Sequence, residues 1–164
     1  MSKKLCHVGI GSNLGNELGK PIDHINQAIA WLKNHPNFAD FCVSSLYTSK
    51  AFGVTDQPDF INAVAKFYTD LPALHILDIL QGFEQQAKRV RVRRWGERSL
   101  DLDLLTYGDE QIDNERLTVP HMGIFERNFV VIPMLEISPD IVIRGQIIKN
   151  LEIANKHQGL TRAK

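Results

Sequence analysis

RWGERSLDLDLL, residues 94–105, joins a basic segment to the pattern of a β-strand. Between Leu100 and Leu105 apolar and acidic residues alternate, so Asp101 and Asp103 should leave the same face of a sheet about 7 Å apart. Two carboxylates on one rigid face suit Mg²⁺, which usually takes one or two carboxylates and completes its shell with water and substrate phosphates. The alternation therefore predicts a strand that carries a magnesium site.

The segment just before this strand is rich in cations, namely Lys88, Arg89, Arg91, Arg93, Arg94 and Arg98. Arginine binds phosphate well, so the arginines and the acids together make the two halves of a phosphoryl-transfer site. Between them, Trp95 offers a flat face to a base or an arginine, and Gly96 permits a tight turn. Alone, an Asp-x-Asp strand is more often a solvated sheet face, and a basic run is more often a solvated surface or a nucleic-acid patch. Their adjacency favours a nucleotide-phosphate site.

Composition limits the class of protein. A chain of 164 residues can form one domain with a core, so we expect a single domain over residues 1–164. Lys plus Arg equals Asp plus Glu at 19 each, which leaves no net field to attract nucleic acid or an anionic membrane. No apolar run approaches a membrane span and no signal peptide precedes the first strand pattern, so we expect a cytoplasmic protein. There Cys6 and Cys42, which lie in apolar segments, should be reduced thiols.

The apolar periodicity predicts the order strand, helix, strand, strand, helix, strand. The predicted strands cover residues 5–11, 38–49, 60–69 and 100–105. One helix opens at Pro21 and should bury Ile22, Ile25, Ile29 and Leu32; the other opens at Pro72 and should bury Leu74, Leu77, Leu80 and Phe83. This order indicates an α+β fold of the ferredoxin-like, split β-α-β kind, with four antiparallel strands backed on one side by two helices.

Beyond these elements, the glycine-rich turn at residues 11–16 matches neither a Walker loop nor a dinucleotide-binding loop, although it permits close approach of a ligand. A short edge strand is expected at Ile112, an extended loop over residues 116–121, and a helix through residues 129–135 despite Pro133. From about Ile141 we expect a C-terminal extension with a short strand and a last amphipathic helix around Leu151, which would cover the core.

The stretch at residues 94–105 resembles the signature of the 6-hydroxymethyl-7,8-dihydropterin pyrophosphokinases of folate biosynthesis. The resemblance extends to GSNLG at residues 11–15, DQPDFIN at residues 56–62 and RLTVPH at residues 116–121. Four motifs in the same order over some 140 residues make it specific. It implies a monomeric, ferredoxin-like, Mg²⁺-dependent transferase that moves the pyrophosphoryl group of ATP to the pterin hydroxymethyl group and releases AMP.

The resemblance also implies roles for individual residues. Asp101 and Asp103 would hold two Mg²⁺ ions, with Arg89 and Arg91 as further catalytic residues. The residues expected to bind ATP are Gln81, Glu84, Arg91, Trp95, Arg98, Leu104, Arg116, Thr118 and His121. Those expected to bind the pterin are Ser49, Lys50, Phe52, Phe60, Asn62, Asp101 and Phe129, with Phe60 and Phe129 stacking on its two faces. Arg127 falls at a further arginine position of the family.

Two alternatives to this interpretation stay open. Lys50 and Met122 stand where the family often has proline and an aromatic residue, and the segment between Glu84 and Arg94 is one residue short; a relative that acts on a modified pterin would explain such changes. Ferredoxin-like sheets also carry RNA, so the basic run with Trp95 could belong to a non-catalytic nucleic-acid-binding module. The plain alternative for Phe60 and Phe129 is that they pack in the core. For His121 it is that the residue lies in a loop and forms only local hydrogen bonds.

Overall fold

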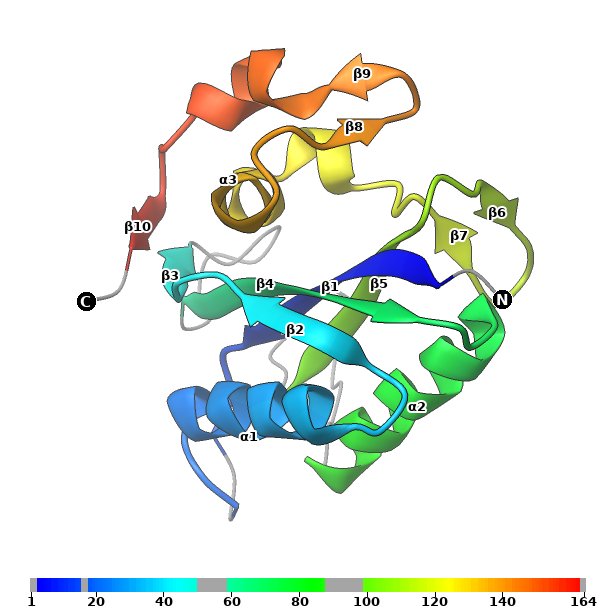
Figure 1. Ribbon diagram of the computed structural model, residues 1–164. Coiled ribbons are helices and arrows are strands. Elements are labelled where there is room, and N and C mark those ends of the chain that lie inside the picture. Colours follow the sequence, from blue (N-terminus) through cyan, green and yellow to red (C-terminus); the bar gives the residue numbers. More distant parts are fainter. Residues whose placement is uncertain (1–2, 16–17, 50–58, 88–98, 163–164) are drawn as a thin grey trace.

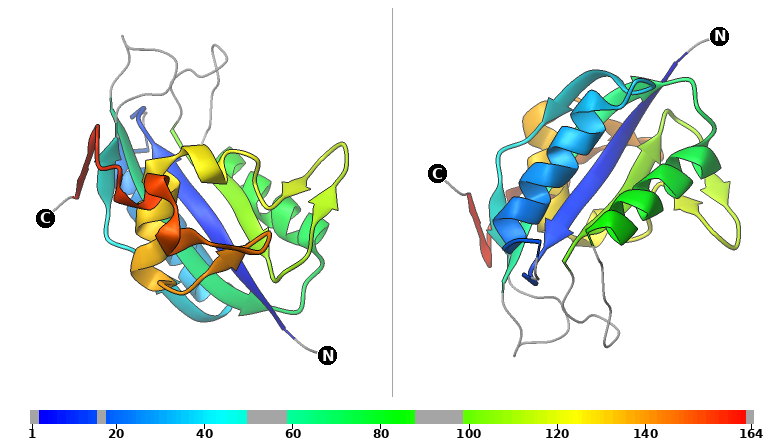
Figure 2. Two further views of the ribbon diagram at one scale, coloured as in Figure 1. Left: turned by 90° about the horizontal axis from the view of Figure 1, so that it is seen from above. Right: turned by 90° about the horizontal axis from the view of Figure 1, so that it is seen from below.

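A twisted antiparallel sheet lies at the centre of the molecule, with helices on both of its faces (Figures 1 and 2). The computed structural model describes residues 3–15, 18–49, 59–87 and 99–162. Helices α1 (Pro21–Asn34) and α2 (Ala73–Gln86) cover one face, and α3 (Asn128–Ile137) with the C-terminal segments covers the other. The described part contains no helix long and apolar enough to cross a membrane.

The strands of this sheet are β1 (Lys4–Ser12), β2 (Ala39–Val43), β3 (Tyr47–Ser49), β4 (Phe60–Thr69), β5 (Asp101–Tyr107) and β10 (Leu160–Arg162). Their order is β10-β3-β4-β1-β5, and β2 also pairs with β4. The expected ferredoxin-like plan is confirmed for β1, α1, β4, α2 and β5. Gly11 on the central strand β1 pairs with Asn62 on one side and with Asp101 on the other, so three distant motifs meet across neighbouring strands.

The two helices on the first face bury the larger core. Ile25 and Leu32 of α1 and Leu77 and Leu80 of α2 are buried as expected. Ile22 and Leu74 are instead 37% and 39% exposed, so their predicted burial is wrong. A stripe that contains residues 77 and 80 can begin at either 73 or 74, because both positions lie close to that side of a helix. The structure turns Ala73 and Ile76 inward, and in α1 it buries His24 and Ala28.

The expected strand over residues 38–49 is divided in two. Between β2 and β3, the Val64 backbone N–H donates to Ser44 Oγ at 3.0 Å, while Ser44 N–H donates to Val64 O at 2.9 Å. The Ser44 side chain thus accepts a hydrogen bond that a backbone carbonyl would accept in a regular strand pair. Serine often disrupts regular structure in this way, because its hydroxyl can replace a backbone partner. The strand therefore breaks at Ser44 and resumes at Tyr47.

The second face is covered by short elements around α3. They are the hairpin β8 (Val142–Ile143) and β9 (Gln146–Ile147), and 3₁₀ helices at Ile124–Glu126, Ile148–Asn150 and Glu152–Asn155. The hairpin β6 (Ile112–Asp113) and β7 (Thr118–Val119) lies instead beside β5 and α2, with Leu117 and Val119 buried in the larger core. The expected last helix around Leu151 is wrong, because Leu151 is extended (φ −80°, ψ 150°) and separates two 3₁₀ turns. The tail then returns to the sheet as β10, which the sequence did not indicate.

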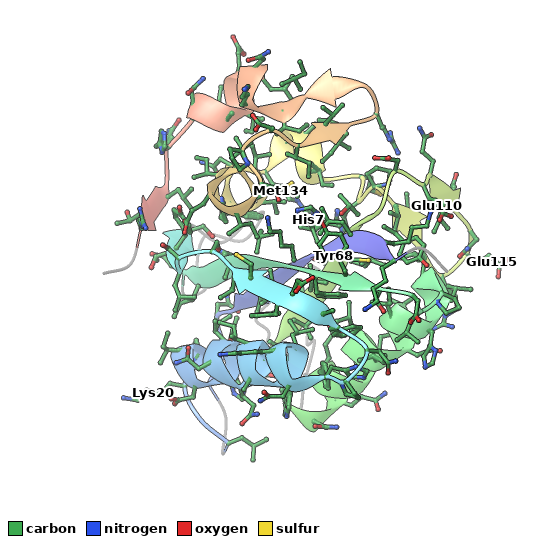
Figure 3. The ribbon with its side chains drawn as sticks, viewed as in Figure 1. His7, Lys20, Tyr68, Glu110, Glu115 and Met134 are labelled. Atoms are coloured by element: carbon green, nitrogen blue, oxygen red, sulfur yellow. The ribbon has the colours of Figure 1, made fainter. Side chains whose placement is uncertain are left out.

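A smaller core lies between α3 and the sheet, with Val64, Leu105, Ile124, Val131 and Met134 buried in it. Figure 3 shows Met134 and His7 in this layer, whereas Lys20, Glu110 and Glu115 lie at the surface. The pairing of β1 with β5 shifts between His7 and Val8, so β5 has one extra residue there. After this bulge Thr106 lies beside His7, on the same sheet face as Leu105.

Candidate active site

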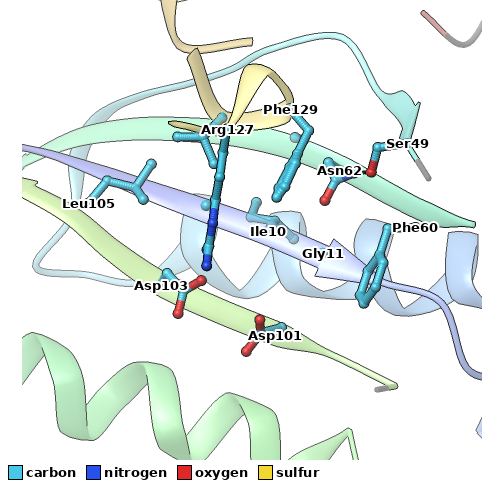
Figure 4. A pocket seen from close by; sticks show the side chains of 13 residues that line it. Ile10, Gly11, Ser49, Phe60, Asn62, Asp101, Asp103, Leu105, Arg127 and Phe129 are labelled. Atoms are coloured by element: carbon cyan, nitrogen blue, oxygen red, sulfur yellow. Dashed lines mark hydrogen bonds between the residues drawn. The ribbon is translucent and has the colours of Figure 1, made fainter. Parts of the chain in front are cut away.

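A pocket opens on the α3 side of the sheet, where β5 begins and β1 approaches its end (Figure 4). Its polar lining comes from Ser49, Asn62, Asp101, Asp103 and Arg127, and its aromatic lining from Phe60 and Phe129. These residues belong to β3, β4, β5, α3 and the residue that precedes α3. The fold therefore brings together the Asp-x-Asp strand and those residues expected to bind the pterin that the structure describes.

The acidic pair lies as the alternation predicted. Asp101 and Asp103 are both half-buried and both line the pocket, while Leu102 between them is buried in the first core. Glu84 of α2 accepts a hydrogen bond from the Leu102 backbone N–H at 2.8 Å, which ties this part of β5 to the helix layer. The described residues contain no cluster of three or more potential metal ligands. Two carboxylates on one strand face nevertheless fit Mg²⁺, which takes few protein ligands when it binds phosphates.

Glycine forms the floor beside these acids. In the β1–β5 ladder Gly9 pairs with Asp103 and Gly11 with Asp101, so β1 presents bare backbone to the pocket. A Cβ atom on Gly11 would lie 3.2 Å from Asn62 Oδ1 and 3.7 Å from a ring carbon of Phe60. The first distance is tighter than an ordinary contact, so a side chain at residue 11 would press on Asn62.

Asn62 is held by its neighbour on β3. Its Nδ2 donates to Ser49 Oγ at 2.6 Å, and both side chains are buried. This bond uses one of the two amide N–H groups and leaves the other N–H and Oδ1 for a ligand. The Ser49 hydroxyl, having accepted from Asn62, keeps its own proton for donation. The pair can thus present donors and an acceptor to the edge of a heterocycle.

Two aromatic rings and one arginine complete the pocket wall. Phe60 comes from the start of β4 and Phe129 from the first turn of α3, and Figure 4 shows them on either side of Asn62. The Arg127 guanidinium carbon lies 5.8 Å from the centre of the Phe129 ring, within the range of a cation–π contact. Figure 4 also shows Arg127 reaching down toward Asp103 on β5. A cation therefore lies near the acidic pair.

The described residues expected at the ATP side come from α2, β5 and the loop around β7. Arg116 donates to Asp78 Oδ1 at 2.5 Å and to Gln81 Oε1 at 3.3 Å, so two of the predicted residues meet. Thr118 lies on β7 and is half-buried. Leu104 is only 2% exposed and packs in the first core, so its side chain does not face the pocket and only its backbone is available to a ligand.

His121 connects this loop to the pocket. Its backbone N–H donates to Leu105 O at 3.0 Å, and its Nδ1 accepts from the Gly123 N–H at 3.1 Å. Burial lowers the pKa of His121, and the charge of Arg127 acts in the same direction, while the charge of Asp101 opposes both. The ring is therefore neutral at pH 7 with its proton on Nε2, where it can donate to an anion without a full charge.

Comparison with known proteins identifies the family of this chain. Residues 7–139 match the family model described as 7,8-dihydro-6-hydroxymethylpterin-pyrophosphokinase (HPPK). The chain belongs to the HPPK family.

Relatives within the family are similar over most of their length. A 2-amino-4-hydroxy-6-hydroxymethyldihydropteridine pyrophosphokinase of Haemophilus influenzae is 48% identical over 139 residues, which are 84% of this chain and 87% of the relative. The enzyme of the same name from Pseudomonas aeruginosa is 39% identical over 150 residues, or 91% and 93%. A solved Plasmodium falciparum HPPK-DHPS, crystallised with pterin and p-hydroxybenzoate, superimposes with a TM-score of 0.73 at 11% identity; it covers 99% of this chain, which spans 45% of that longer protein. This last likeness supports the fold.

Several predicted HPPK site residues lie outside the described part of the chain. They are Lys50, Phe52, Arg89, Arg91, Trp95 and Arg98. Their roles stay predictions. Asp78, in contrast, is a contact that the sequence reasoning missed, although its spacing of three residues from Gln81 on a helix was a usable signal. The resemblance gives Arg127 only as a matched arginine position, and its place beside Phe129 and Asp103 follows from the tertiary fold.

Proposed function

We propose that this chain transfers the pyrophosphoryl group of ATP to the hydroxymethyl group of 6-hydroxymethyl-7,8-dihydropterin, releasing AMP, in folate biosynthesis. The observation that carries the proposal is the single pocket that holds the Asp101–Asp103 pair together with Asn62, Phe60 and Phe129. Membership of the HPPK family supports the same reaction.

The pterin end of the pocket is the part with the Asn62–Ser49 hydrogen bond. The amide of Asn62 and the hydroxyl of Ser49 offer complementary groups to the edge of the pterin, and Phe60 and Phe129 offer faces for its ring. This binding would orient the hydroxymethyl oxygen toward the acidic pair. Lys50 and Phe52 are proposed to complete this end.

The phosphate end is proposed at Asp101 and Asp103, which would hold two Mg²⁺ ions. Bound there, Mg²⁺ would neutralise charge on the ATP phosphates. Arg127 and the neutral donor His121 would add hydrogen bonds near those phosphates. Arg89, Arg91 and Arg98 are proposed as further phosphate contacts, and Gln81, Glu84, Trp95, Leu104, Arg116 and Thr118 as ATP contacts.

We further infer that residues 1–164 act as one pyrophosphokinase domain, since the segments after the matched region pack on α3 and, through β10, on the same sheet. A monomeric state stays a prediction, which sedimentation analysis would measure.

The experiment measures AMP release from ATP and Mg²⁺, with and without 6-hydroxymethyl-7,8-dihydropterin. AMP formation that depends on the pterin is the expected result. Folded protein that forms no AMP under either condition would overturn the proposal. Repeating the assay with other 6-substituted pterins tests the alternative that Lys50 and Met122 adapt the site to a modified substrate; equal or better turnover of such a pterin would favour that alternative.

A further inference from the structure

The last strand of the described chain docks beside the pterin end of the pocket. Strand β10 pairs antiparallel with β3, with Leu160 opposite Ser49 and Arg162 opposite Tyr47. On its other edge β3 pairs with β4, where Tyr47 lies opposite Asn62. Strand β3 is only three residues long, so its position depends strongly on these two neighbours.

A second set of bonds ties β3 to α3. Glu136 accepts from the backbone N–H of Ser45 at 2.8 Å and from its hydroxyl at 3.0 Å, and it accepts from the Tyr47 hydroxyl at 2.7 Å. Burial raises the pKa of Tyr47 to about 12, and the hydrogen bond to Glu136 adds to this effect. The phenol therefore stays protonated and keeps donating at all ordinary pH values.

Arg162 links β10 to this group of hydrogen bonds. Its guanidinium donates to Ser45 Oγ at 2.7 Å, while that same hydroxyl donates to Glu136. Burial alone would raise the pKa of Glu136, but the bonds from Tyr47 and Ser45 and the charge of Arg162 bring it below its usual value. Glu136 is therefore ionised at neutral pH, and charged hydrogen bonds of this kind are stronger than neutral ones.

The elements joined by these bonds are the two walls of the pterin end. Strand β3 ends at Ser49, whose hydroxyl accepts from Asn62, and α3 begins with the turn that carries Phe129. Glu136 lies about two helical turns beyond Phe129 on the same helix. A shift of β3 against α3 would change the gap between the Asn62–Ser49 pair and the Phe129 ring.

We propose that β10 is part of the substrate-binding apparatus, with Arg162, Ser45, Tyr47 and Glu136 as positioning residues that set the width of the pterin site. This inference rests on the proposed function, because it assumes that the pterin binds between Asn62 and Phe129. None of the four needs to touch the substrate. Their effect is exerted through Ser49 and Phe129.

The test compares binding of 6-hydroxymethylpterin and of a non-hydrolysable ATP analogue to the full-length protein and its variants. Arg162→Ala removes the bond from β10, and Tyr47→Phe removes one bond to Glu136 without changing the ring. We expect each to raise the Kd for the pterin about three- to tenfold, with a smaller change for the ATP analogue. Arg162→Lys keeps a donor and should restore most of the pterin affinity.

Lys149→Ala is the matched control. It removes an exposed ion pair with Asp140 in the same C-terminal region, away from β3, and should leave the affinity for both ligands unchanged. Melting temperatures of all variants are measured in parallel. If Arg162→Ala or Tyr47→Phe lowers the melting temperature but leaves pterin affinity unchanged, or weakens both ligands equally, β10 is only a structural strand and the inference is wrong. If the unaltered protein binds no pterin even with the ATP analogue and Mg²⁺ present, and forms no AMP from ATP and the dihydropterin, the proposed function itself fails.

Discussion

The sheet face under α3 has polar side chains at both ends, and the two ends use them differently. At the pocket end, Asn62, Asp101 and Asp103 line a cavity. At the other end, His7 on β1 and Thr106 on β5 meet Ser138 after α3, with His7 Nδ1 2.8 Å from Thr106 Oγ1 and Nε2 2.9 Å from Ser138 Oγ.

Lys66 on β4 completes the second group, because its ammonium donates to Ser138 Oγ at 3.4 Å and to the Ile137 carbonyl. Strands β4 and β5 thus supply side chains to both groups, and Leu105, Val64 and Met134 separate the groups. His7 and Thr106 also line a cavity, at the opposite end of the sheet, so facing a cavity does not by itself distinguish the two groups. The difference teaches that buried polar residues indicate a ligand site where hydrogen-bonding groups are left for a ligand, as in the Asn62 amide. Where they satisfy one another, they serve stability.

The largest expected effect is on the pocket end. Asp101→Ala or Asp103→Ala should lower pterin-dependent AMP release by about a hundredfold or more, because a carboxylate that would hold the metal is lost. The melting temperature should change little, since both residues are only half-buried. Asp109→Ala, at the opposite end of the sheet, is the control and should retain activity. Normal turnover by either folded variant would show that the acidic pair is not needed for the reaction, and the functional contrast between the two ends of the sheet would be lost.

The next largest effect is expected from His7, at the end of the sheet opposite the Asp101–Asp103 pocket. It should appear as a pH dependence of the free energy of unfolding. Burial lowers the pKa of His7 to about 4, and the nearby charge of Lys66 adds to this. The folded protein therefore binds fewer protons than the unfolded chain. The free energy of unfolding therefore has its full value, as far as His7 is concerned, above about pH 6.5. It should decrease by about 3 kcal/mol as the pH falls toward 4, because the unfolded chain then binds a proton at His7 more readily than the folded protein does.

Urea unfolding of the unaltered protein and of His7→Gln between pH 7 and pH 4 measures this contribution. The difference between their pH slopes should isolate His7, while pterin binding at pH 7 stays the same in both. A His7→Gln variant with the same pH slope as the unaltered protein would contradict the prediction.

A smaller effect is expected from the pocket floor. Gly11→Ala places a methyl group against Asn62 Oδ1, so the affinity for the pterin should fall about tenfold, a loss comparable to one disturbed hydrogen bond. Gly82→Ala is the control, because a Cβ atom there meets nothing within 4 Å and α2 should gain about 0.5–1 kcal/mol. Isothermal titration with 6-hydroxymethylpterin distinguishes them, and equal affinity for Gly11→Ala would show that the floor tolerates a side chain.

The smallest effect is expected at the Arg116–Asp78 ion pair. Both side chains are about half exposed, at 48% and 58%, and such pairs contribute about 0–1 kcal/mol. Asp78→Ala should therefore change the KM for ATP by no more than about threefold. A change well beyond this would show that Asp78 orients Arg116 for the nucleotide, and would add Asp78 to the α2 residues that act at the ATP side.

How far the sequence predicts this molecule depends on how local each feature is. The same-face placement of Asp101 and Asp103 follows from the two-residue period of a strand, which needs no tertiary information. The break at Ser44 was missed, because it depends on a bond to Val64, 20 residues away. The return of β10 to β3 was missed for the same reason.

The candidate site shows the same limit. Asn62 and the acidic pair could be named from motifs, but their approach across Gly11 requires the register of three strands. Arg127, the residue that precedes α3, reaches the pocket, and no helix or strand periodicity in the sequence predicts this placement. The side-chain direction of Leu104 follows from strand alternation alone, and places it with Leu102 in the first core.

The bare glycine floor beside Asp101 and Asp103 has an evolutionary consequence. Its depth is set by the backbone of β1, which is paired on both sides. A side chain at Gly11 would press on Asn62, whereas a Cβ atom at Gly9 would meet Leu105 at ordinary contact distance. The walls, by contrast, come from four other elements and can be exchanged one residue at a time. New substrate preferences in this lineage should therefore arise in the walls, while Gly11 is retained in the floor.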